Sequence, residues 1–361
     1  MRVISRTIPL AAAVAILLLA PTLDVRAQWV TQASNTAASL RGISAVSAQV
    51  AWASGSGGTV LRTVDGGRAW RADTVPGATG LDFRDVHGMS AQVALLLTAG
   101  SPGRVYRTTD GGRNWRVVYE DTTPTIFFDG MAFWNARDGI AVSDPVDGGW
   151  IVIRTSDGGR TWTRLPPTAI PAPLAGEAAF AASGTMVSTW GTRHAWFVTG
   201  GGASARVYRT MDKGRSWRVS DTGVPASATA GLFSVAFSTA TRGVAVGGDY
   251  RTSRARDNYV LRSADGGRSW QRSPPDDSAS MYSAVVPARV AAAAQGSSGM
   301  LVAVGLGGTG VSRDGGRTWH AADTLTLHSA SFAGWGTGWA VGPGGRVLRW
   351  LEPSRPRSRS R

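Results

Sequence analysis

The middle of the sequence contains the carboxyl groups best placed to do chemistry. Glu177, one of only three glutamates, lies in a long proline-rich segment, PPTAIPAPLAGEAAFAASG. Together with Asp144 it could supply the two carboxyl groups that hydrolyse a glycosidic bond. A tyrosine activated by this glutamate, such as Tyr250, is a further candidate nucleophile. If the chain is an enzyme, we therefore expect Glu177, Asp144 and Tyr250 to be its catalytic residues.

The same region offers other polar side chains that suit ligand binding. The segments SDPVDGGW, GTRHAW and GGDYRTSRARDNY interrupt a simpler pattern found elsewhere, and FFDGMAF places an aspartate near the start of a predicted strand. Long connections between strands are uncommon in compact folds and are often functional. The candidate ligand-binding residues are Asp129, Asp144, Asp147, Glu177, Arg193, His194, Asp249 and Arg251.

Composition excludes several other kinds of site. The chain has no cysteine, so it forms neither disulfide bonds nor thiolate metal sites. Its four histidines lack metal-ligand spacing, and no helix pattern follows its glycine-rich stretches, as a dinucleotide site requires. We therefore expect no metal and no cofactor. The basic residues are not clustered with stacking aromatic residues, so we expect no nucleic-acid partner.

A short phrase that ends in tryptophan organises the chain. It occurs as RTVDGGRAW, RTTDGGRNW, RTSDGGRTW, RTMDKGRSW, RSADGGRSW and VSRDGGRTW. Successive aspartates are 45, 47, 55, 53 and 49 residues apart, and short alternating apolar runs lie between them. This period, with four strand-like runs in each repeat, is typical of the four-stranded antiparallel blades of a β-propeller.

Each phrase predicts a hairpin clasp. The aspartate can accept hydrogen bonds from backbone N–H groups, a hydroxyl two residues earlier can join them, and glycine permits the turn conformation. The tryptophan is expected to pack in the seam between neighbouring blades. The aspartates are Asp65, Asp110, Asp157, Asp212, Asp265 and Asp314, and the tryptophans are Trp70, Trp115, Trp162, Trp217, Trp270 and Trp319.

These phrases resemble the Asp-box, or bacterial neuraminidase repeat, with the pattern Ser/Thr-x-Asp-x-Gly-x-x-Trp. All six fit at the four fixed positions, and Lys213 replaces only a variable glycine. The resemblance implies that each box joins the two outer strands of a blade, away from the axis. It also suggests a sialidase, with Glu177 and Tyr250 or Tyr282 as the nucleophilic pair. Sialidases, however, have six blades and an Arg-Ile-Pro phrase that this chain lacks near its N-terminus.

The ends of the repeat array predict a seventh blade. Residues 327–350, LHSASFAGWGTGWAVGPGGRVLRW, repeat the first three strands of a blade and stop before a fourth. QWVTQAS, from Gln28, looks like the missing fourth strand. Closing the ring with strands from both ends of the chain removes its open edges. We therefore expect an all-β, seven-bladed propeller over residues 28–352, followed by a disordered basic tail over residues 353–361.

The first 27 residues predict export. A basic start, an apolar run from Ile8 to Ala20 and the triplet Val25-Arg26-Ala27 are typical of a signal peptide cleaved near Ala27. The apolar run is too short for a bilayer-spanning helix, and no other stretch could span a membrane. The expected location is the periplasm or the exterior. The net charge is +14, carried almost entirely by arginine, since Lys213 is the only lysine.

Two phrases indicate a second resemblance. FFDGMAFWNARDGIAVSDPVDGG and SVAFSTATRGVAVGGDY are similar to the propeller of the photosystem II stability and assembly factor family and its non-photosynthetic bacterial relatives. This resemblance implies a non-enzymatic scaffold that binds a protein or an extended ligand across one propeller face. We expect a monomer of this kind with an unknown partner. The alternative is a glycoside hydrolase that uses the carboxylates of the middle blades.

Overall fold

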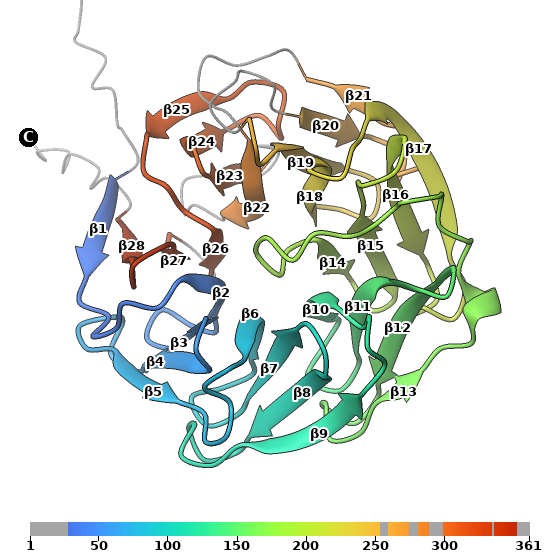
Figure 1. Cartoon of the computed structure of the whole chain (residues 1–361). Coiled ribbons are helices and arrows are strands. Elements are labelled where there is room, and N and C mark those ends of the chain that lie inside the picture. Colours follow the sequence, from blue (N-terminus) through green and yellow to red (C-terminus); the bar gives the residue numbers. More distant parts are fainter. Residues whose placement is uncertain (1–27, 253–258, 274–280, 289–298, 334–335, 352–361) are drawn as a thin grey trace, which may run out of the picture.

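Seven β-sheets surround a central axis in the computed structural model of the chain (Figure 1). The structure describes residues 28–252, 259–273, 281–288, 299–333 and 336–351. Each sheet has four antiparallel strands. In six of the sheets these strands follow the order of the sequence from the axis outwards, and in the seventh the outermost strand comes from the N-terminal end of the described chain. The predicted seven-bladed propeller is therefore confirmed. The one short 3₁₀ helix in the described residues is η1 (Pro167–Ala169).

The first four blades follow each other along the chain. Blade 1 contains β2 (Leu40–Ala45), β3 (Ala51–Gly55), β4 (Thr59–Thr63) and β5 (Arg71–Thr74). Blade 2 contains β6 (Asp82–Gly88), β7 (Ala94–Ala99), β8 (Gly103–Thr108) and β9 (Arg116–Asp121). Blade 3 contains β10 (Phe128–Phe133), β11 (Gly139–Val146), β12 (Gly149–Thr155) and β13 (Thr163–Arg164). Blade 4 contains β14 (Val187–Trp190), β15 (His194–Val198), β16 (Ser204–Thr210) and β17 (Arg218–Pro225).

The remaining blades complete the ring. Blade 5 contains β18 (Ala230–Phe237), β19 (Gly243–Asp249), β20 (Tyr259–Ser263) and β21 (Gln271–Arg272). Blade 6 contains β22 (Tyr282–Ala288), β23 (Met300–Gly305), β24 (Gly308–Ser312) and β25 (His320–Asp323). Blade 7 contains β26 (Ser329–Phe332), β27 (Gly338–Val341), β28 (Val347–Leu351) and β1 (Gln28–Gln32).

The N-terminal strand closes the ring, as predicted. β1 pairs with β28 over its whole length, from Gln28 opposite Leu351 to Gln32 opposite Val347. The carboxamide oxygen of Gln32 accepts hydrogen bonds from the indole N–H groups of Trp70, at 2.8 Å, and Trp339, at 3.1 Å. Because Trp70 belongs to blade 1 and Trp339 to blade 7, this one side chain joins the two blades that meet at the closure.

All six aspartate turns have the same internal hydrogen bonds. The Ser or Thr hydroxyl donates to the aspartate Oδ1 at 2.8–2.9 Å and accepts from a glycine N–H at 2.8–3.0 Å. The Oδ1 atom also accepts from the backbone N–H four residues later, as Thr161 shows for Asp157 at 3.0 Å. Burial favours the protonated form of Asp157, but bonds from Thr161 and Thr155 outweigh it and lower the pKa to about 2. These carboxylates therefore hold the turn.

The repeated tryptophans lie where blades meet. Trp70 is buried and meets Trp339 edge to face, with ring centroids 6.4 Å apart. Trp162, Trp217 and Trp319 are also buried, whereas Trp115 and Trp270 are half-buried. Each buried indole removes a large apolar surface from water, a gain of about 2–3 kcal/mol.

The propeller has two distinct faces. We call the end at which the innermost strands begin the channel face, and the opposite end, where all six aspartate turns lie, the turn face. In blades 1 to 5 the aspartate turn is hydrogen-bonded to the turn between the first two strands, so both connections share the turn face. The backbone bonds run from Gly66 to Gln49, Gly111 to Gln92, Gly158 to Arg137, Lys213 to Arg193 and Gly266 to Thr241.

Candidate functional site

The long connection before β14 reaches the central axis of the ring. We call residues 171–186 the plug; Figure 1 shows this light-green segment reaching the middle of the ring. The Ser183 hydroxyl donates to the carbonyl of Ser283 at 2.8 Å, and the carbonyl of Ser183 accepts from the Ser329 hydroxyl at 3.0 Å. These partners belong to blades 6 and 7. A segment that enters from blade 4 therefore crosses the axis.

Further bonds attach the plug to blades 2, 3 and 5. Arg84 Nη1 donates to the carbonyl of Ala181 at 3.3 Å, and Asp144 Oδ1 accepts from the Ala179 N–H at 2.7 Å. The hydroxyls of Thr185 and Ser234 lie 2.7 Å apart. The plug is thus bonded to five blades besides its own, which gives it a defined position.

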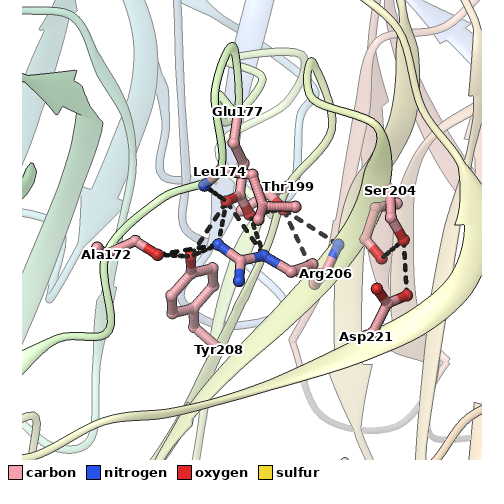
Figure 2. A network of polar contacts seen from close by, with 9 residues as sticks. Ala172, Leu174, Glu177, Thr199, Ser204, Arg206, Tyr208 and Asp221 are labelled. Carbon is pink, nitrogen blue, oxygen red and sulfur yellow. Dashed lines mark hydrogen bonds and ion pairs between the residues drawn. The ribbon is translucent and has the colours of Figure 1, made fainter. Parts of the chain in front are cut away.

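Glu177 anchors the plug through a buried ion pair (Figure 2). Its side chain is 0% exposed and pairs with Arg206 of β16, whose Nε lies 3.0 Å from Oε1 and whose Nη2 bonds to Oε2. Thr199 donates to Oε1 at 2.6 Å, and the Leu174 N–H donates to Oε2 at 2.7 Å. Because both oxygens of this buried carboxylate already accept hydrogen bonds, no lone pair is directed to solvent. The side chain therefore holds the plug backbone in place.

The tyrosine beside Glu177 is Tyr208, which the sequence analysis did not consider. Its hydroxyl lies 3.2 Å from Glu177 Oε2, and it also bonds to Arg206 Nη2. Burial, followed by the charge of Glu177, raises the pKa of Tyr208 above its usual range. Tyr208 is therefore neutral at any physiological pH. Its ring is stacked on Phe197 and completely buried, so no substrate reaches the pair.

Three aspartates lie beneath the plug. Asp85 accepts from the backbone N–H groups of Met131 and Val86, each at 2.7 Å, so it joins blade 2 to blade 3. Asp129 is 0% exposed, and neither carboxylate oxygen has a hydrogen bond among the described residues. Burial raises the pKa of Asp85 to about 7 and that of Asp144 to about 6. Burial, followed by the charge of Asp144, raises the pKa of Asp129 well above its usual range.

These raised pKa values predict that the fold loses stability as the pH rises. A carboxyl group whose pKa in the folded state lies above its unfolded value of 3.8 makes its full contribution to stability below pH 3.8. That contribution is lost as the pH rises through the pKa of the folded state. For Asp85 the contribution is lost between pH 4 and 7, by at most about 1.4 kcal/mol for each pH unit. We therefore expect the contribution of Asp85 to the free energy of unfolding, from urea titrations at pH 4.5 and 7.5, to be lower at the higher pH; burial lowers the pKa of His87 and His328 to about 4, which acts in the opposite direction over this window.

The matched variant is Asp85→Asn, which keeps the shape of the side chain and does not ionise. It is expected to reduce this difference between the two pH values. Equal pH dependence in the variant and the unchanged chain would show that Asp85 does not titrate in this window.

A row of three aromatic rings in contact extends beside the plug from the interior to the surface of the channel face. Phe233 of β18 is buried and meets the plug residue Phe180 at a centroid distance of 4.6 Å. Phe180 in turn meets Tyr250 at 6.3 Å, and Tyr250 is 44% exposed. Leu174, in the outer part of the plug, is 39% exposed. Apolar and aromatic surface is therefore accessible on this face.

The structure brings most of the candidate binding residues to the channel face. Asp129 and Asp144 lie under the plug, Glu177 within it, and Asp147 is exposed in the adjoining turn between β11 and β12. Asp249 lies at the end of β19, where Oδ1 accepts from the N–H of the exposed Arg251 at 2.8 Å.

Arg193 and His194 are not brought to this cluster. They lie in the hairpin between β14 and β15, where Trp190 is opposite His194, at the end of the innermost strand. The carbonyl of Arg193 accepts from the Lys213 N–H of the aspartate turn, which places the pair on the turn face. The sequence analysis grouped them with the carboxylates because they are near in sequence, whereas antiparallel strands send successive connections to opposite faces.

The sequence analysis missed a group of basic residues on the channel face. Arg41 and Arg84 occupy equivalent positions in β2 and β6, each the extra residue of a β-bulge. His328 of blade 7 bonds through Nδ1 to the carbonyl of Leu40 at 2.8 Å. Burial, followed by the charge of Arg41, lowers the pKa of His328 to about 4, so it is neutral. When the repeats are aligned, Arg41, Arg84 and Asp129 fall at the same position. This alignment could have identified the group from the sequence.

The described residues contain no group of three or more His, Cys, Asp and Glu side chains that could hold a metal ion. In the same part of the chain, no helix has the length and apolar character needed to cross a bilayer.

Comparisons with known proteins agree with this architecture. The family model of the photosynthesis system II assembly factor YCF48 matches residues 21–126. A solved structure of YCF48 bound to a D1 peptide aligns with a TM-score of 0.60 and 18% identity, over 92% of this chain and 99% of that one. The chain resembles the YCF48 assembly factors.

Two further solved structures share the fold. YCF48 from Cyanidioschyzon merolae has a TM-score of 0.60 and 18% identity, over 90% of this chain and 99% of its own. The WD40 β-propeller domain of Doa1 has a TM-score of 0.57 and 12% identity, over 92% and 99%. No curated protein matches the sequence. At these identities the structural likeness establishes the propeller architecture.

Proposed function

We propose that the chain is an exported, monomeric, non-enzymatic propeller that binds an extended protein segment on its channel face. The observation that carries this proposal is the plug, which is hydrogen-bonded across the axis to blades 6 and 7 and brings exposed apolar surface to the channel face. On that surface Leu174 and Tyr250 are 39% and 44% exposed, and Arg251 is exposed beside them. Aromatic residues and arginine are typical of the energetic centres of protein interfaces.

The likeness to YCF48 supports the same proposal. One of the similar structures is a propeller in complex with a peptide. We do not assign that peptide to this chain, because the partner must be chosen by the side chains of this channel face. The leader sequence supports a location in the periplasm or outside the cell, with the mature chain beginning near Gln28.

The alternative, a glycoside hydrolase, would need carboxylates that reach a sugar ring. Glu177 is fully enclosed and bonded, and Asp129 is also completely buried. Asp144 is half-buried and uses Oδ1 to hold the Ala179 N–H. Tyr250 is exposed, but it meets Phe180 rather than Glu177. The geometry therefore favours binding over hydrolysis.

Site-specific photo-crosslinking tests the proposed face. A photoreactive residue replaces Tyr250, and the matched control places it at Met211, which has a similar exposure of 53% but lies in an aspartate turn. In periplasmic extract, position 250 is expected to give one discrete polypeptide adduct that excess unlabelled chain competes away, and position 211 is not. The absence of that adduct, or cleavage of a glycoside panel by the purified protein, would contradict the proposal.

A further inference from the structure

The arginines of the repeat are concentrated on the turn face. The residue three positions after each turn aspartate is an exposed arginine in all six turns: Arg68, Arg113, Arg160, Arg215, Arg268 and Arg317. The neighbouring turns between the first and second strands add the exposed Arg137, Arg193 and Arg242. Arginine remains charged at all physiological pH values, so this face carries a permanent ring of cations.

Acidic residues offset only part of the positive charge of this face: the six turn aspartates balance the six turn arginines, and Arg137, Arg193 and Arg242 remain in excess. Among the described residues, the carboxylates of the turn face are the six turn aspartates and Asp138, and Asp138 pairs with Lys213 at 2.7 Å. The other described carboxylates lie toward the channel face, among them Asp82, Glu120 and Asp249. Charge is thus separated along the propeller axis, and the turn face is positive.

Two exposed apolar side chains of the turn face point to the same kind of partner. Val64 and Met211, each just before a turn aspartate, are 51% and 53% exposed. Cations and isolated apolar side chains distributed over a broad face suit a flat anionic surface with an apolar interior.

We propose that the turn face binds the surface of an anionic phospholipid membrane, which leaves the channel face directed away from the bilayer. The dispersed ring favours lipid over nucleic acid, because nucleic-acid sites gather their cations in a patch or stripe. The arginines would bind lipid phosphates, and Val64 and Met211 would enter the headgroup region. This proposal is independent of the identity of the protein partner.

Vesicle co-sedimentation tests it with the chain that begins at Gln28, which keeps every strand of the propeller. The chain is expected to bind phosphatidylcholine vesicles that contain phosphatidylglycerol, to be released by high salt, and not to bind phosphatidylcholine alone. The triple variant Arg68→Gln, Arg113→Gln, Arg215→Gln removes guanidinium groups without a side-chain hydrogen bond among the described residues. Each substitution is expected to weaken binding roughly fivefold, and all three about a hundredfold.

The matched control removes the same charge from the channel face, with Arg104→Gln, Arg251→Gln and Arg346→Gln, and is expected to retain most of the binding. A chain ending at Leu351 measures the contribution of the C-terminal arginines, and the triple turn variant is expected to weaken this shorter chain as well. Equal loss in the two triple variants, salt-independent binding, or binding to soluble heparin without binding to vesicles would overturn the proposal.

Discussion

Replacing Glu177 with alanine is expected to lower the free energy of unfolding by about 3–5 kcal/mol. The substitution leaves Arg206, which is 9% exposed, without its ionic partner in a buried position. It also removes the acceptor for Thr199 and for the Leu174 N–H, so the plug loses its anchor to blade 4. Urea denaturation followed by tryptophan fluorescence measures the difference.

The control for this prediction removes both charges together. In the double variant Glu177→Leu, Arg206→Met no charge is left buried and unpaired, so the loss of stability is expected to be smaller than in Glu177→Ala. If Glu177→Ala were as stable as the unchanged chain, the carboxylate would not be the anchor that its hydrogen bonds indicate.

Removing β1 is expected to lower the free energy of unfolding by an amount similar to or greater than that of Glu177→Ala. A chain that begins at Asn35 loses the fourth strand of blade 7 and the bonds of Gln32 to Trp70 and Trp339. It also loses Trp29, which meets Trp350 edge to face at a centroid distance of 4.9 Å. Partial burial of one indole and two hydrogen bonds together contribute about 3–5 kcal/mol. We therefore expect a lower midpoint in thermal unfolding and a tendency to associate through the exposed edge of β28.

Two controls separate ring closure from general sensitivity to truncation. A chain ending at Leu351 keeps all strands and is expected to melt like the full-length protein. The substitution Gln32→Leu keeps the strand but removes the acceptor for both indoles, and it is expected to have an intermediate effect. An unchanged melting temperature after removal of β1 would contradict closure by the N-terminal strand.

The repeat made the architecture predictable. The spacing of the six aspartates gave the blade period, and the unmatched segments at the two ends gave the seventh blade and its closure by β1. These inferences depended on local turn chemistry and on alternation within short strands, which the sequence displays directly. The partners of Gln32 were not predicted, because Trp70 and Trp339 are distant in sequence and meet only when the ring closes.

The candidate site was less accessible to sequence reasoning. The long segment around Glu177 was recognised as irregular, but its course across the axis depends on bonds such as Ser183 to Ser283, a hundred residues away in the chain. Arg206 was overlooked because it sits in an ordinary strand, ARVYRT, that matches GRVYRT of blade 2. In blade 2 the equivalent Arg104 pairs with Glu120 of the neighbouring strand β9, whereas Arg206 pairs with the plug.

Hydrogen–deuterium exchange over residues 171–186 tests the central claim most directly. If the plug is a fixed part of the propeller, the N–H groups of Glu177, Ala178 and Ala179, which donate to Leu174, Gly200 and Asp144, exchange slowly. In Glu177→Gln the same amides are expected to exchange faster, whereas the strands of blades 1 and 6 remain protected. Rapid exchange of these amides in the unchanged chain would show that the connection does not occupy the channel, and would contradict the account.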